Sequence, residues 1–177
     1  LNYVAGQTIP NAVVSKVGVD GKVCLFTKAA SHIIVDVNGY FPASASYTPL
    51  LPARLLESRV GLATVDGRFN AIAARAAESV TKLTVAGRGG VADDASSVLL
   101  NVTVTGTQGP GFVAVFPCGE ERPNASNLNY SPGQTIPNLV VAKIGANGQV
   151  CLFTKAATDL IVDVNGYYAN HDHDDRY

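Results

Sequence analysis

Two histidines close to the end of the chain, His171 and His173, are the residues best suited to bind a transition metal. If this segment is extended, alternate side chains point to the same side and the two imidazoles share a face. Two imidazoles alone make a poor metal site, whereas three chains side by side would supply enough for octahedral coordination. We therefore expect a metal here only on the axis of a trimer. The alternative is an unstructured polar tail or a tag-like artefact.

Two Asp-Val-Asn segments combine a carboxylate and an amide two residues apart, Asp36 with Asn38 and Asp163 with Asn165. Calcium prefers oxygen ligands of this kind. A carboxylate beside an Asn-Gly sequence can instead accept hydrogen bonds from the turn that this dipeptide favours. Both interpretations are kept, and the turn-structuring role is preferred.

Three tyrosines, Tyr3, Tyr130 and Tyr47, could together form a platform on which a sugar ring stacks. Tyrosines more often cover the end of a sheet, with the hydroxyl group in water. Glycan stacking is therefore kept as a hypothesis beside this more ordinary role.

A long segment of the chain occurs twice. Residues 1–40 align without a gap with residues 128–167, at an offset of 127, and 29 of the 40 positions are identical. Near-copies on this scale indicate a tandem array of units. The expected organisation is the C-terminal part of a preceding repeat (1–41), a linker (42–46), a complete β-repeat domain (47–168) and a tail (169–177). A domain that spans the linker is the alternative.

The cysteines follow the repeat. Cys24 and Cys151 occupy the same position in the two copies, whereas Cys118 has no counterpart. The simplest pairing is one bridge per repeat, from Cys118 to Cys151, with Cys24 left unpaired. Such a bridge indicates an oxidising, extracellular setting. Three buried free thiols are the alternative.

The two copies also argue against catalysis. His32 is replaced by Asp159 in the second copy, so it cannot serve every unit. The remaining carboxylate pairs are isolated, and the sequence contains neither a phosphate-binding loop nor a nucleophile elbow. A Ser-His-Asp triad would have to recruit the chain end. We expect no enzymatic activity.

The elements that would position these residues are strands. The chain is 47% hydrophobic and 15% charged. Its apolar residues are mainly Val, Leu, Ala and Ile, and this composition favours strands over helices. Residues 98–104 alternate apolar and polar side chains, which predicts a half-buried strand. About seven strands in the complete unit predict an all-β, disulfide-stapled antiparallel sandwich or barrel. Residues 71–78 form either one short helix, on their Ala content, or a small-residue loop.

The clearest predicted element is a hairpin in both copies. Its strands would be residues 12–17 and 22–27 in the first copy, and residues 139–144 and 149–154 in the second. The Asp-Gly and Asn-Gly dipeptides between them accept the positive φ of tight hairpin turns. A third strand, ending at Asn-Gly-Tyr, follows in each copy, so residues 1–41 would carry about three strands.

The tail sequence Asn-His-Asp-His-Asp-Asp-Arg-Tyr resembles the His-x-His-Asp-Asp-Arg-Tyr segments of phage tail fibres and related trimeric fibre proteins. The likeness covers about eight residues. In such proteins this segment commonly opens a trimeric region, and His-x-His pairs can bind iron on the threefold axis. The resemblance implies a homotrimer with a metal at His171 and His173.

Four motifs in the body of the chain resemble repeats of large secreted proteins of actinobacteria and similar bacteria. They are Pro-Ala-Arg-Leu-Leu-Glu-Ser-Arg (52–59), Val-Ala-Gly-Arg-Gly-Gly-Val (85–91), Leu-Asn-Val-Thr-Val (100–104) and Ile-Val-Asp-Val-Asn-Gly-Tyr (161–167). The resemblance spans nearly the whole chain and implies no catalytic role. Many such units carry Asp in a Leu-Leu-Asp-Thr-Arg segment where this chain has Glu57, so a role for that carboxylate stays open.

The expected function is that of a non-catalytic structural or adhesive module, repeated along an extracellular fibre, stalk or surface protein. A net charge of −1 with scattered basic residues argues against nucleic-acid binding. No apolar stretch is long enough to span a bilayer. The expected partners are neighbouring copies of the repeat. The alternative is a carbohydrate-binding module that gains avidity for a surface glycan through repetition. No cofactor is expected beyond the metal and calcium sites above.

Overall fold

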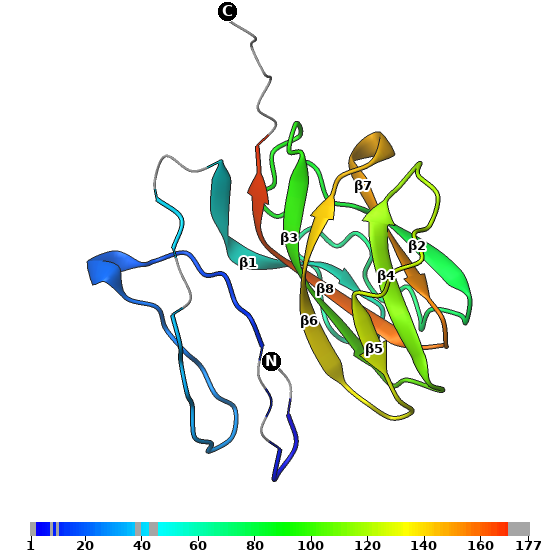
Figure 1. Ribbon diagram of the computed structural model, residues 1–177, viewed down its shortest axis with the longest axis horizontal. Coiled ribbons are helices and arrows are strands. Elements are labelled where there is room, and N and C mark those ends of the chain that lie inside the picture. Colours follow the sequence, from blue (N-terminus) through cyan, green and yellow to red (C-terminus); the bar gives the residue numbers. More distant parts are fainter. Residues whose placement is uncertain (1–2, 8, 10, 38–39, 43–45, 170–177) are drawn as a thin grey trace, which may run out of the picture.

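The chain folds as a β-sandwich of two four-stranded antiparallel sheets (Figure 1). The computed structural model describes residues 3–7, 9, 11–37, 40–42 and 46–169. The strands are β1 (Tyr47–Glu57), β2 (Ser79–Thr84), β3 (Ser97–Thr105), β4 (Gly111–Pro117), β5 (Leu128–Tyr130), β6 (Ile136–Lys143), β7 (Gln149–Thr154) and β8 (Asp159–Tyr168). The described residues contain no α-helix, only two short 3-10 turns, η1 (Val19–Gly21) and η2 (Ala146–Gly148). The all-β class is confirmed, and the fold is a sandwich of two separate sheets and not a barrel.

In each sheet, strands from the first part of residues 47–168 alternate with strands from the last part. The first sheet has the order β1-β8-β3-β6 and the second has β2-β7-β4-β5. We call β1–β4 the front half and β5–β8 the back half. Every strand pairing joins one front-half strand to one back-half strand. Neither half therefore has a sheet of its own.

The core lies between the two sheets. On β3, Val98, Leu100, Val102 and Val104 are fully buried, as their alternation predicted. On the opposite face Asn101 stays partly exposed, but Thr103 is buried, so β3 is more buried than a half-buried strand. The four inward-facing residues belong to one apolar cluster with residues of both sheets, including Leu55, Leu83, Val113, Leu152 and Val162. Burial of these apolar side chains is the main force that holds the two sheets face to face.

The hairpin predicted in the second copy is wrong, although its turn is right. Asn147 and Gly148 do adopt positive φ, at 58° and 66°. The strands on either side, β6 and β7, lie in different sheets, so they do not pair with each other. A Cβ on Gly145 would collide with the backbone of Cys118, and the Ala146 amide donates to the Cys118 carbonyl at 2.7 Å. The turn therefore carries the chain from one sheet to the other.

Residues 1–41 contain the same turn but no described strand, so the three strands expected there do not form. Asp20 has φ 56° and ψ 27°, nearly the values of its counterpart Asn147, φ 58° and ψ 29°. The segment runs beside the sandwich without joining a sheet (Figure 1). Strands need partners for their backbone groups, and the front half in this chain is already paired with the back half.

The Asn-Gly sequence of the complete unit lies inside a strand, so the turn predicted at this point is wrong. β8 continues to Tyr168, and Asn165 forms a bulge because Gly166 pairs with Leu99 while Val164 pairs with Leu100. The glycine is required here, since a Cβ on Gly166 would collide with the hydroxyl group of Tyr47. The bulge extends β8 far enough to reach the start of β1.

Residues 71–78 form a loop, not a helix. Ala71, Ala73 and Glu78 have positive φ values of 51°, 65° and 53°, which a right-handed helix does not allow. The loop is held at one point by a pair of backbone hydrogen bonds between Arg75 and Thr158. A high Ala content indicates helix propensity only where nothing else fixes the backbone.

Candidate functional site

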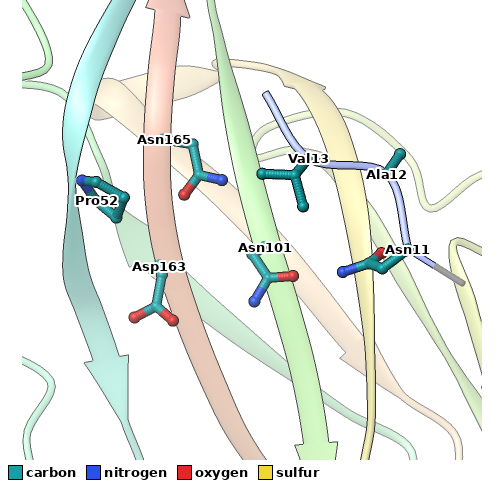
Figure 2. Close-up of a pocket in the computed structure, with 7 residues that line it drawn as sticks. All are labelled: Asn11, Ala12, Val13, Pro52, Asn101, Asp163 and Asn165. Atoms are coloured by element: carbon teal, nitrogen blue, oxygen red, sulfur yellow. The ribbon is translucent and has the colours of Figure 1, made fainter. Parts of the chain in front are cut away.

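A hollow with both polar and apolar side chains in its walls lies on the outer face of the first sheet, and Figure 2 shows these side chains. Its volume is about 190 Å³. The lining residues are Asn101 on β3, Asp163 and Asn165 on β8, Pro52 on β1, and residues 11–13 of the N-terminal segment. Asn101 and Asp163 lie directly opposite each other in the β3–β8 register. Adjacent strands thus bring a carboxylate and two amides to one place.

Asp163 is engaged by an arginine from the neighbouring strand. Arg54 lies opposite Asp163 in the β1–β8 register. Its Nε donates to Oδ1 at 2.8 Å and its Nη2 donates to Oδ2 at 3.3 Å. This forked arrangement occupies both carboxylate oxygens. Of the two amides, that of Asn101 belongs to a partly exposed residue and is the better placed to meet a ligand, whereas Asn165 is only 9% exposed.

Calcium at this position stays a prediction, and the arginine weighs against it. A calcium ion would have to compete with Arg54 for the Asp163 carboxylate. The structure contains no cluster of three or more His, Cys, Asp or Glu side chains suited to a metal among its described residues. In the first copy, Asp36 is exposed. Asn38, together with the predicted metal ligands His171 and His173, lies outside the described residues.

Glu57 is the centre of a salt-bridge cluster at the end of β1. Its side chain is fully buried, and it accepts hydrogen bonds from Arg54 at 2.8 Å and from Arg59 Nε at 2.7 Å. Burial opposes ionisation of this carboxyl, but the hydrogen bonds from Arg59 and the charges of both arginines outweigh it and lower its pKa. Its side chain therefore holds the end of β1 in place, which answers the question that the sequence left open.

A second ion pair joins the buried Arg88 to Asp66, whose side chain is 32% exposed. The Arg88 side chain is 2% exposed and donates to the two Asp66 oxygens, each at 2.7 Å. It also donates to the carbonyl oxygens of Thr84 and Leu55, and it lies over the ring of Phe69. These contacts tie the long loop between β1 and β2 to both strands. In the sequence, Arg88 belonged only to the motif at residues 85–91 and had no predicted partner.

We expect the stability of the protein to fall in acid because of Asp66. The hydrogen bond from Arg88 lowers the pKa of Asp66 from 3.8 to about 2. A carboxyl whose pKa is lower in the folded state stabilises the fold above its unfolded pKa, and this contribution is lost as the pH falls. The loss should be about 1–2 kcal/mol between about pH 5 and pH 2, reduced by partial exposure to solvent. Urea denaturation across this range measures it, and an Asp66→Asn variant should show a smaller decrease.

The tyrosines predicted to stack on a sugar do not form a platform. Tyr47 and Tyr130 are buried, at 6% and 4% exposure, and only Tyr3 is partly exposed. The Tyr130 hydroxyl donates to the Ala156 carbonyl at 2.8 Å. Burial, with a smaller contribution from Tyr168, raises the pKa of Tyr47 to about 12. A sugar cannot stack on a ring that has no free face, so this prediction is wrong for two of its three residues.

The disulfide between Cys118 and Cys151 is present, as predicted, and Cys24 is exposed and free. The bridge joins the end of β4 to β7, with a Cα–Cα distance of 5.0 Å. It packs with Ala114, Phe112, Phe116 and Phe153 in a small apolar cluster apart from the main core. The bridge thus links the front half covalently to the back half.

No protein-family model matches this chain, and no curated protein matches its sequence. Within the described part of the chain, no helix has the length and apolar character needed to cross a membrane. The disulfide is compatible with an extracellular location.

Proposed function

We propose that this chain is a non-catalytic structural or adhesive repeat module of an extracellular fibre, stalk or surface protein. The observation that carries the proposal is the contrast between the two copies of the repeated segment. Phe26 is 91% exposed, whereas its counterpart Phe153 is 8% exposed. Val37 is 86% exposed, whereas Val164 is fully buried. The first copy thus exposes apolar side chains that are buried in the sandwich in the second copy. This is expected if the first copy is part of a neighbouring unit.

The charged groups support a scaffold over an enzyme. Glu57, Asp66 and Asp163 are each bound to an arginine. A general acid or base works best with a pKa near the working pH, and the pKa values of Glu57 and Asp66 are moved away from neutrality. Their geometry suits the positioning of loops and strands.

The positions where the chain enters and leaves the sandwich favour a unit that projects from a linker over a unit stacked end to end in a stalk. Tyr47, at the start of β1, lies opposite Tyr168, at the end of β8, and the Ala169 amide donates to the Ser46 carbonyl at 3.2 Å. The chain therefore enters and leaves the sandwich at the same end (Figure 1). Successive units joined in this way would project sideways from their linkers. This supports a surface or adhesive role more than that of a long, stiff stalk.

The partners in this proposal are neighbouring copies of the same repeat, as a homo-oligomer. A trimer would place His171 and His173 of three chains around one axis, where they could hold a transition metal. The trimer and the secretion of the protein to the cell surface are proposed from the sequence alone.

The second candidate function is carbohydrate binding, and the polar side chains in the hollow favour it. The side-chain amides of Asn101 and Asn165 beside Asp163 could exchange hydrogen bonds with sugar hydroxyl groups. The hollow has no exposed aromatic ring among its described lining residues, which is the feature that most sugar sites use. For this reason we place the structural role first.

Two measurements on the full chain test the proposal. Light scattering should give the mass of a trimer, and a glycan array at millimolar calcium should show no saturable binding. A strict monomer without bound metal would remove the fibre-like assembly. Saturable glycan binding that an Asn101→Ala variant loses, while a Phe26→Ala variant keeps it, would replace the structural role with carbohydrate binding.

A further inference from the structure

We propose that residues 1–41 can replace residues 128–168 as the back half of the sandwich, pairing with strands β1–β4 of the same chain. The structure shows one of two arrangements of the chain, and the other is a circular permutation of the same fold. This inference depends on the strand order and the repeated segment, and not on the extracellular role proposed above.

The strand order makes the exchange feasible. All four strands of the back half pair only with strands of the front half, and none pairs with another back-half strand. The front half therefore presents two separate strand sets, β1 with β3 and β2 with β4, whose partners come entirely from elsewhere in the sequence. Any segment with the back-half pattern can complete these sheets.

The first copy has the residues that the front half contacts. Val23, Leu25, Val35 and Val37 are identical to Val150, Leu152, Val162 and Val164, all of which are fully buried in the sandwich. Where buried positions differ, the change is small: Ser15 for Ala142, Ser31 for Thr158 and Ile33 for Leu160. The sheet-crossing turn is already formed in the first copy, with nearly the same dihedral angles. A core tolerates an exchange such as Leu for Ile at modest cost, and the hydroxyl of Ser15 would need a hydrogen-bond partner.

The linker has the right length for pairing within one chain. By the same offset, Phe41 corresponds to Tyr168 and Pro42 to Ala169. In the structure, Tyr168 pairs with Tyr47 in the β1–β8 register, and the Ala169 amide donates to the Ser46 carbonyl. A back half made from residues 1–41 would therefore end beside the start of β1, leaving residues 43–45 as the loop. A loop of about three residues is common between antiparallel strands.

The two arrangements contain equivalent strand pairings, because in each of them one back half is bound and the other is released. The balance between them is then set by the differing residues and by the disulfide. Cys24 corresponds to Cys151, so in the second arrangement it would lie beside Cys118. A Cys24–Cys118 bridge is thus a specific signature of the exchange.

The test uses the full chain with a Val162→Asp/Cys151→Ser double variant. Val162 is fully buried, so an aspartate there should exclude residues 128–168 from the core, and the serine removes the original bridge. We expect the variant to keep its β-sheet circular dichroism. Both remaining thiols should be lost to a Cys24–Cys118 bridge within one chain, seen by peptide mapping without reduction.

Val35 provides the matched control. It is the counterpart of Val162 but is 61% exposed, so Val35→Asp alone should leave the fold intact. Added to the double variant, Val35→Asp should abolish the β-sheet signal and restore two free thiols. The proposal is overturned if the double variant is unfolded with free thiols, or if its residues 149–164 keep their hydrogen-exchange protection. A Cys24–Cys118 bridge that joins two chains would overturn it as well.

Discussion

Replacing Cys118 and Cys151 together with alanine is expected to lower the free energy of unfolding by about 3–4 kcal/mol. The bridge spans a sequence separation of 33, and its removal frees the unfolded chain to sample many more conformations. It is also a covalent cross-link between the front and back halves, in addition to the chain connection from β4 to β5. Guanidinium denaturation of the parent and the variant measures the difference.

Cys24 supplies the control for this experiment. Because it is exposed and free, Cys24→Ala should leave the denaturation midpoint unchanged. A reducing agent should lower the stability of the parent to that of the double variant and have no effect on the variant itself. If the double variant is as stable as the parent, the bridge makes no net contribution to the fold.

Asp66→Ala is expected to lower the free energy of unfolding by about 3 kcal/mol. The cost arises from the partner that stays behind. Arg88 has a side chain only 2% exposed, so it cannot turn to water when its carboxylate is lost. An unpaired buried charge is more costly than the loss of an exposed ion pair. Thermal and urea denaturation at neutral pH measure this effect.

Two comparisons isolate the buried charge as the cause. Glu78 forms an exposed ion pair with Lys155, so Glu78→Ala should cause no measurable loss of stability. In an Asp66→Ala/Arg88→Met double variant, the cost should be less than the sum of the two single costs by at least about 1 kcal/mol. Simple additivity would show that the pair does not act as a unit.

The polar contacts show what a sequence cannot reveal about a site. Asp163 and Asn165 were singled out by their spacing, and the structure places both at the hollow. Arg54, which occupies the Asp163 carboxylate, is 109 residues away in the chain. No local pattern connects the two, because only the β1–β8 register brings them together. The Arg88–Asp66 pair was missed for the same reason, across 22 residues.

The turn at η2 has one feature that is set by its own residues and one that is set by distant parts of the chain. Asn-Gly predicted positive φ correctly, since that preference depends on the dipeptide itself. The same local turn can close a hairpin or carry the chain to the opposite sheet. The collision that a Cβ on Gly145 would make with the Cys118 backbone marks the second outcome, and this contact exists only in the folded unit.

The sequence by itself predicted the all-β class, the inward-facing residues of β3, the positive φ values at Asp20 and Asn147, and the pairing of Cys118 with Cys151. Each of these depends on residue type, on short-range alternation or on the comparison of two copies. Only the tertiary structure decided which strands are neighbours, and with this the interleaving of the two halves and the partners of Glu57, Arg88 and Asp163. Alternation tells which face of a strand is buried, but the choice of neighbour is set by packing between distant segments.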